Sequence, residues 1–137
     1  MKYLLVACLF CACADLSPPQ IIYNSSDGNA EVRFGKEVVA LGALPAKPVL
    51  RAYPHPKIGV LYLVEFSRGD SCPAQYLALL RNAQYYNLGE VGNCNDVRVN
   101  LTPAESIGLD FDGTDAPGIH RKKISFAISA NGSLQRR

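Results

Sequence analysis

Apolar and polar residues alternate with a period of two over several short stretches of the chain after residue 30. The alternation is clearest at 97–101, and it recurs at 32–34, 107–111 and 124–128. Strands with one face in the core and the other face in water have this pattern. Turn-forming residues separate the stretches about every ten residues. The pattern therefore predicts a mainly β fold, a small antiparallel β-sandwich or barrel.

Two stretches have a different pattern. The segment 58–66 is apolar at both odd and even positions, which predicts a central strand covered on each face. The segment 75–83 fits either a strand or a two-turn helix, and we favour the strand because the Asn- and Gly-bearing segment 84–93 indicates a hairpin end. The fold class includes at most one short helix, a turn at 102–106 with Pro103 at its first helical position.

The start of the chain has the order of a secretory signal peptide. Lys2 precedes an apolar run at 4–10, and small residues follow the run. The run is shorter than the roughly 20 apolar residues that a membrane-spanning helix needs. Ala12 and Ala14 would direct cleavage before Asp15, so we expect an exported, soluble periplasmic protein.

A lipid anchor is the alternative outcome of export. Cys13 ends a sequence that resembles a bacterial lipobox, and its lipidation would anchor the protein in the outer membrane. The sequence thus predicts a signal peptide at 1–14, a tether or turn-rich lead-in at 15–30 and a single β-rich domain at 31–137. Contact with a membrane is expected only through the anchor.

The cysteine count predicts one disulfide in the folded domain. Of five cysteines, three lie in the predicted signal peptide, which leaves Cys72 and Cys94. In an oxidising compartment two such thiols normally form a bridge, and a loop of this length is worth about 3 kcal/mol. A zinc site is not expected, because His55 and His120 have neither the paired spacing nor the closeness to the cysteines that zinc needs.

Length and charge limit the classes of partner. The chain of 137 residues suits one domain, and its net charge is only +2, with 14 Lys and Arg among 12 Asp and Glu. The basic cluster Arg121-Lys122-Lys123 is more typical of a solvated strand start than of a track that binds phosphates. We therefore expect no binding of nucleic acid.

One segment resembles the sequence motif of an active site. Asp110-Phe111-Asp112-Gly113-Thr114 resembles the opening of the haloacid-dehalogenase-type phosphatases, in which two aspartates act on a phosphoryl group with magnesium. The 23 residues after Thr114 hold Asp115 but no Glu, so the later carboxylates of that chemistry are missing. A second interpretation is a weak calcium-binding loop formed by Asp110, Asp112 and Asp115. We favour a strand-ending turn and expect no cofactor and no metal.

No nucleophile with a neighbouring base is evident, so we look for binding residues in the loops. Arg68-Gly69-Asp70 is an integrin-type tripeptide or an ordinary turn. Tyr85 and Tyr86 stand at a predicted hairpin tip, where a ring is either exposed for binding or packed over the disulfide. We expect a partner-binding surface on the loops 67–71, 84–88 and 110–116. Its predicted contact residues are Arg68, Asp70, Tyr85, Tyr86, Asp110 and Asp112.

The stretch "LYLVEFSRGDSCPAQYLALL…LGEVGNC" resembles small uncharacterised exported proteobacterial proteins. These have an apolar strand, a Cys-Pro-Ala-x-Tyr segment and a second Cys, and the likeness covers about 58–99. The chain departs from them at Val91-Gly92-Asn93, where they often have Phe-Gly. The resemblance implies a disulfide-bonded periplasmic domain and carries over no catalytic residue.

Together these features predict an exported, non-catalytic binding protein of the bacterial envelope, of the kind that inhibits a periplasmic enzyme or confers immunity to it. Its partner would be another protein. Two alternatives stay open: a lipoprotein accessory subunit of an envelope assembly, and a cation-dependent hydrolase that uses Asp110 and Asp112.

Overall fold

The computed structural model describes residues 15–137, so the predicted signal peptide and Cys13 lie outside the described residues. All regular structure in the described part is β, in thirteen strands that pair antiparallel. The segment 102–106 forms bends, not the short helix that Pro103 allowed. A helix that could span a membrane is absent from residues 15–137.

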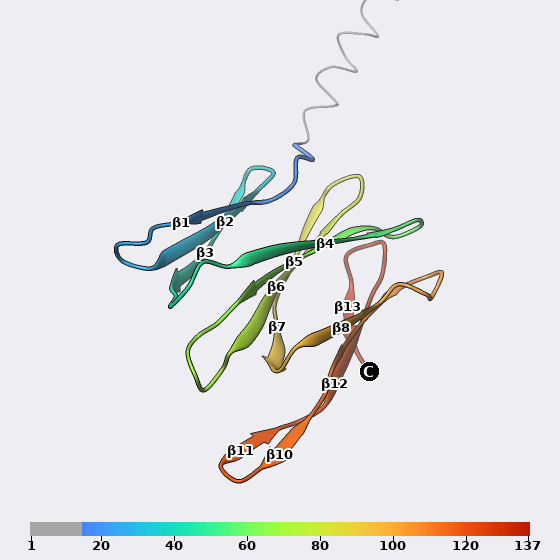
Figure 1. Ribbon diagram of the computed structural model, residues 1–137. Coiled ribbons are helices and arrows are strands. Elements are labelled where there is room, and N and C mark those ends of the chain that lie inside the picture. Colours follow the sequence, from blue (N-terminus) through green and yellow to red (C-terminus); the bar gives the residue numbers. More distant parts are fainter. Residues whose placement is uncertain (1–14) are drawn as a thin grey trace, which may run out of the picture.

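The strands form three sheets and a separate hairpin (Figure 1). The first sheet has the order β1-β2-β3, with β1 (Gln20–Tyr23), β2 (Asn29–Phe34) and β3 (Glu37–Ala43). The central sheet has the order β4-β5-β6-β7, with β4 (Val49–His55), β5 (Gly59–Phe66), β6 (Ala74–Arg81) and β7 (Tyr85–Cys94). The third has the order β13-β12-β9-β8, with β8 (Val97–Asn100), β9 (Ile107–Phe111), β12 (Ile124–Ile128) and β13 (Leu134–Arg136). The hairpin consists of β10 (Thr114–Ala116) and β11 (Ile119–Arg121).

The inner strands β5 and β6 of the central sheet are buried on both faces, which explains the continuous apolar run of β5. On one face, Leu61, Leu63 and Tyr76 pack with Leu109 and Phe111 of the third sheet. The other face packs against the first sheet through a second cluster, which includes Tyr62, Val64, Leu77, Leu79, Val32 and Phe34. The predicted antiparallel sandwich is confirmed. Its central sheet packs against the third sheet on one face and against the first sheet on the other.

The predicted disulfide is confirmed. Cys72 precedes β6 and Cys94 ends β7, and their Cα atoms lie 4.6 Å apart. Because β6 and β7 pair from Ala74↔Cys94 to Arg81↔Tyr85, the bridge clamps the open end of the β6–β7 hairpin. It also fixes the chain where it leaves the central sheet for the third sheet.

The lead-in predicted at 15–30 contributes to the folded domain. Strand β1 pairs with β2 along its whole length, from Gln20↔Arg33 to Tyr23↔Ala30. Tyr23 and Ile21 pack against the core cluster between the first and central sheets. The β fold therefore begins before residue 31.

Candidate functional site

The six residues predicted to contact a partner lie at two ends of the central sheet. Arg68 and Asp70 belong to the loop between β5 and β6, beside the disulfide, whereas Tyr85 and Tyr86 begin β7 at the far end of the β6–β7 pair. Asp110 and Asp112 lie at the end of β9, where Asn93 and Asn95 hydrogen-bond the Asp112 carbonyl. The structure therefore brings the loops 67–71 and 110–116 to one end and leaves 84–88 at the other.

Both tyrosines are used in packing. The Tyr85 ring lies 5.3 Å from the Phe34 ring, its hydroxyl donates to the Ser17 carbonyl over 2.5 Å, and burial raises the pKa of the Tyr85 phenol. The Tyr86 ring packs so closely over Gly132 that a side chain at Gly132 would collide with it. Of the two interpretations, the packed one fits the structure, although the Tyr86 ring covers Gly132 and not the disulfide.

Arg68 is also held in place. Its guanidinium pairs with Glu90 at 3.1 Å and lies 4.9 Å from the centre of the Phe66 ring. A further bond of 3.3 Å reaches the Leu41 carbonyl. The Arg68-Gly69-Asp70 tripeptide thus has its arginine bound to the protein's own side chains, while Asp70 is exposed.

The three carboxylates of the 110–115 segment have separate partners. Ser125 Oγ donates to Asp110 Oδ1 over 2.6 Å, and Arg98 Nη1 donates to Asp112 Oδ2 over 2.7 Å. His120 Nδ1 lies 2.9 Å from Asp115 Oδ1. In the part of the chain that the structure describes, no group of three or more His, Cys, Asp or Glu side chains is placed to hold a metal ion.

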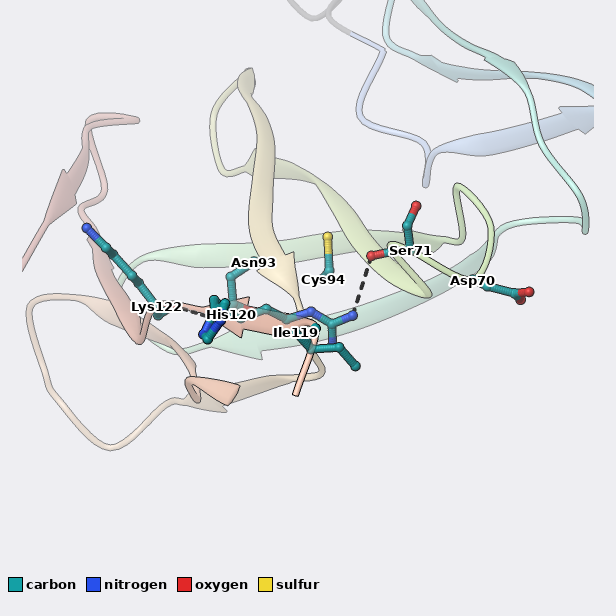
Figure 2. A pocket seen from close by; sticks show the side chains of 9 residues that line it. Asp70, Ser71, Asn93, Cys94, Ile119, His120 and Lys122 are labelled. Carbon is teal, nitrogen blue, oxygen red and sulfur yellow. Dashed lines mark hydrogen bonds between the residues drawn. The ribbon is translucent and has the colours of Figure 1, made fainter. Parts of the chain in front are cut away.

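A different set of residues surrounds an open hollow of about 480 Å³ between the β10–β11 hairpin and the disulfide end of the central sheet. Figure 2 shows this hollow, with Ser71 and Cys94 on one side and the strand that carries Ile119 and His120 on the other. We call it the hairpin hollow. It is lined by Asp70, Ser71, Asn93, Cys94 and residues 118–122.

The hairpin itself is built by a tight turn. Ala116 pairs with Ile119, so the turn consists of Pro117 and Gly118 alone. Pro117 presets its own φ, and Gly118 has a φ of +78°, a conformation that costs glycine little. The short strands therefore leave the third sheet as a projecting loop with a defined shape (Figure 1).

Side chains from the disulfide segment hold the base of the hairpin. Asn93 Nδ2 donates to the carbonyls of Asp112 and Lys122, over 2.8 and 2.7 Å. Asn95 Nδ2 donates to the Asp112 carbonyl over 2.7 Å, and Arg121 Nη1 donates to Asn95 Oδ1 over 2.6 Å. Since Asn93 and Asn95 flank Cys94, the bridge and the hairpin belong to one polar network.

The outer part of the hairpin offers contact groups that the domain does not use. Ile119 is 42% exposed, although its side chain is large and apolar. Lys122 and Lys123, which follow the hairpin, form no ion pair with any residue from 15 to 137. Arg121 is used inside the domain, because its guanidinium is hydrogen-bonded to Asn95 and Ser71. The sequence signals were the Pro117-Gly118 turn and the basic cluster, but the prediction assigned the cluster to a solvated strand start.

Comparison with protein-family models, with curated proteins and with solved structures finds no match to this chain. The resemblance to small exported proteobacterial proteins therefore stays a prediction.

Proposed function

We propose that this chain is an exported, non-catalytic binding protein of the bacterial envelope, and that the hairpin hollow is its contact surface for a protein partner. The observation that carries the proposal is the projecting β10–β11 hairpin with exposed Ile119 at its tip. An apolar side chain that is exposed on a projecting element gains free energy when a partner buries it, by roughly 1.5–3 kcal/mol for a full burial.

The network at the base of the hairpin supports a role in recognition. Asn93, Asn95 and Arg121 fix the hairpin through five hydrogen bonds of 2.6–2.8 Å. An element that is ordered before binding loses little conformational entropy on binding. Inhibitors and immunity proteins gain affinity in this way, so a partner enzyme in the periplasm is the kind of partner that we favour.

The arrangement of carboxylates argues for binding over hydrolysis. Asp110 and Asp112 are the residues that a cation-dependent hydrolase would use. Each carboxylate instead accepts a hydrogen bond from a different side chain, Asp110 from Ser125 and Asp112 from Arg98. A shared cation would need both carboxylates to turn toward one point.

Export is supported by the disulfide, because such bridges persist in oxidising compartments. The two forms of export differ at the N-terminus of the mature protein. Mass spectrometry of the protein isolated from its host would show a free N-terminal Asp15 for the soluble form and a diacylglyceryl group on Cys13 for the lipoprotein.

Site-specific photo-crosslinking in cells tests the contact surface. A crosslinker at position 119 is compared with one at Lys36, an exposed turn residue between β2 and β3. We expect one discrete crosslinked protein from position 119 alone. The partner is then purified and titrated calorimetrically with the wild type and with Ile119→Asp, which should weaken binding about 30-fold, the loss typical of a central interface residue. Crosslinks from position 36 only, or equal affinity of the two proteins, would contradict the proposal.

A further inference from the structure

A second concave site lies between the central and third sheets, away from the hairpin hollow. It is a recess of about 420 Å³ that opens between the edge strand β4 and the start of β8, and it shares no residue with the hairpin hollow. Sites for small molecules have volumes of roughly 300–1,000 Å³. We call it the inter-sheet recess. It is lined by Arg51, Tyr53, Glu65, Tyr76, Asp96 and Val97.

The floor of the inter-sheet recess is rigid. Tyr76 is only 1% exposed, and its hydroxyl donates to Glu65 Oε1 over 3.0 Å. The Tyr76 hydroxyl oxygen also accepts a hydrogen bond from the Val97 amide over 3.2 Å. Glu65 is thereby held by one carboxylate oxygen. Its other oxygen, Oε2, makes no hydrogen bond with residues 15–137.

The walls carry charges of both signs that have loose partners or none within the described residues. Arg51 is 52% exposed, its Nε lies 4.0 Å from Glu65 Oε1, and its guanidinium donates no hydrogen bond within the described residues. Asp96 is exposed and forms no ion pair in the same part of the chain. Arg51 thus has one loose ion pair, to Glu65, and its guanidinium donors stay open beside Glu65 Oε2 and the unpaired Asp96 carboxylate.

We propose that the inter-sheet recess binds a small zwitterion, a free α-amino acid, whose carboxylate meets Arg51 and whose ammonium group meets Glu65 Oε2 and Asp96. A guanidinium fork fits a carboxylate with two parallel hydrogen bonds. Arg51 and Glu65 lie side by side, with Arg51 Nε 4.0 Å from Glu65 Oε1, so a ligand that carries its two charges on neighbouring groups can meet both side chains. The half-buried Tyr53 ring forms a wall for the side chain of the amino acid.

Ligands with a single charge fit the recess less well. A simple carboxylate would neutralise Arg51 but would place a third negative charge near those of Glu65 and Asp96. A simple amine would leave the fork of Arg51 with only its loose ion pair to Glu65. A ligand with both charges gives the open guanidinium donors of Arg51 an acceptor and gives Glu65 Oε2 and Asp96 a cationic donor.

Two-dimensional NMR of the oxidised protein tests this site. Pools of the twenty standard amino acids, each at about 10 mM, are screened for shifts of the backbone amides at Arg51, Glu65, Asp96 and Val97. We expect a saturable response to at least one amino acid. Its N-acetyl and carboxamide derivatives, which each lack one charge, should bind at least about tenfold more weakly, since each loses one charge-assisted contact.

Variants show whether the shifts come from the recess. Arg51→Met and Asp96→Asn should each weaken binding about tenfold while the melting temperature stays near that of the wild type. Arg33→Met is the matched control, because Arg33 is equally exposed (54%) and lies in the first sheet beside Glu31. The proposal is overturned if no pool shifts these amides in the wild type, if the blocked derivatives bind as well as the free amino acid, or if Arg33→Met weakens binding equally. None of these results involves the partner of the hairpin hollow.

Discussion

Tyr76 joins the core to the polar edge of the sandwich, because its buried phenol links Glu65 of β5 to the Val97 amide at the start of β8. Burial raises the pKa of this phenol strongly, and the negative charges of Glu65 and Asp96 raise it further. In the unfolded chain a tyrosine ionises near pH 10. The unfolded state therefore releases a proton that the folded state keeps, so stability is complete below about pH 10 and falls as the pH rises.

Urea unfolding from about pH 8 to pH 11 measures this effect. We expect the free energy of unfolding of the wild type to fall steeply above about pH 10, and that of Tyr76→Phe to fall less. At neutral pH the substitution should cost about 1–2 kcal/mol, because the Val97 amide loses its acceptor. Parallel pH curves for the two proteins would contradict this assignment.

His55, like Tyr76, forms hydrogen bonds inside the fold with all of its side-chain polar atoms. It is 6% exposed, and its Nδ1 lies 3.1 Å from the backbone nitrogens of both Lys57 and Ile58. Since both of these are N–H donors, Nδ1 accepts and Nε2 carries the hydrogen that is donated to the Pro103 carbonyl over 2.7 Å. One side chain therefore closes the β4–β5 turn and anchors the loop 101–106.

Replacing each histidine in turn compares a buried, hydrogen-bonded side chain with an exposed one. His55→Ala should lower the free energy of unfolding by about 2–3 kcal/mol, because three backbone groups lose their partner. His120→Ala should change it by less than about 0.5 kcal/mol, since His120 is exposed on the hairpin. Chemical denaturation of both variants measures the difference. Equal losses would show that the contacts of His55 contribute little.

At the scale of elements, the sequence predicted long strands better than short ones. The stretches at 58–66 and 107–111 became β5 and β9, because alternation or continuous apolarity over five or more residues identifies a strand. The strands of the β10–β11 hairpin have three residues each, too few for a period to be read. Asn93 and Asn95 hold them from about twenty residues earlier in the chain, and such long-range contacts leave no local signal.

The same contacts make the hairpin testable as one element. Asn95→Ala removes the bonds to the Asp112 carbonyl, to Thr114 Oγ1 and from Arg121. Hydrogen exchange at the amides of 114–121 should speed up by about tenfold or more, because the hairpin opens without the sheets unfolding. Asn87→Ala is the control, since Asn87 supports only a local turn at the Gly89 amide. Unchanged exchange in Asn95→Ala would mean that the hairpin is stable by itself.

At the scale of the whole molecule, the sequence indicated a strand covered on both faces but not what covers it. The first and third sheets each have one apolar face, so each could cover either face of β5 and β6. Alternation in the sequence therefore does not tell which sheet lies on which face. Strand β1 was missed because Pro18 and Pro19 precede it and Asn and Ser follow it, which is a composition typical of a tether. The inter-sheet recess combines residues from β4, β5, β6 and β8, so only the stacked sheets bring it together.

The disulfide was predictable from the number of cysteines in the folded domain, and it contributes to the stability of the whole molecule. Bridging residues 22 apart should stabilise the fold by about 3 kcal/mol, chiefly by restricting the unfolded chain. We expect Cys72→Ser/Cys94→Ser to keep its β circular dichroism, because both core clusters lie within the sheets, and to unfold at a lower urea concentration. Because Cys94 lies between Asn93 and Asn95, the variant should also show faster exchange across 114–121. A loss of stability without faster exchange there would show that the asparagines hold the hairpin without the bridge, and an unchanged free energy of unfolding would remove the bridge as a source of stability.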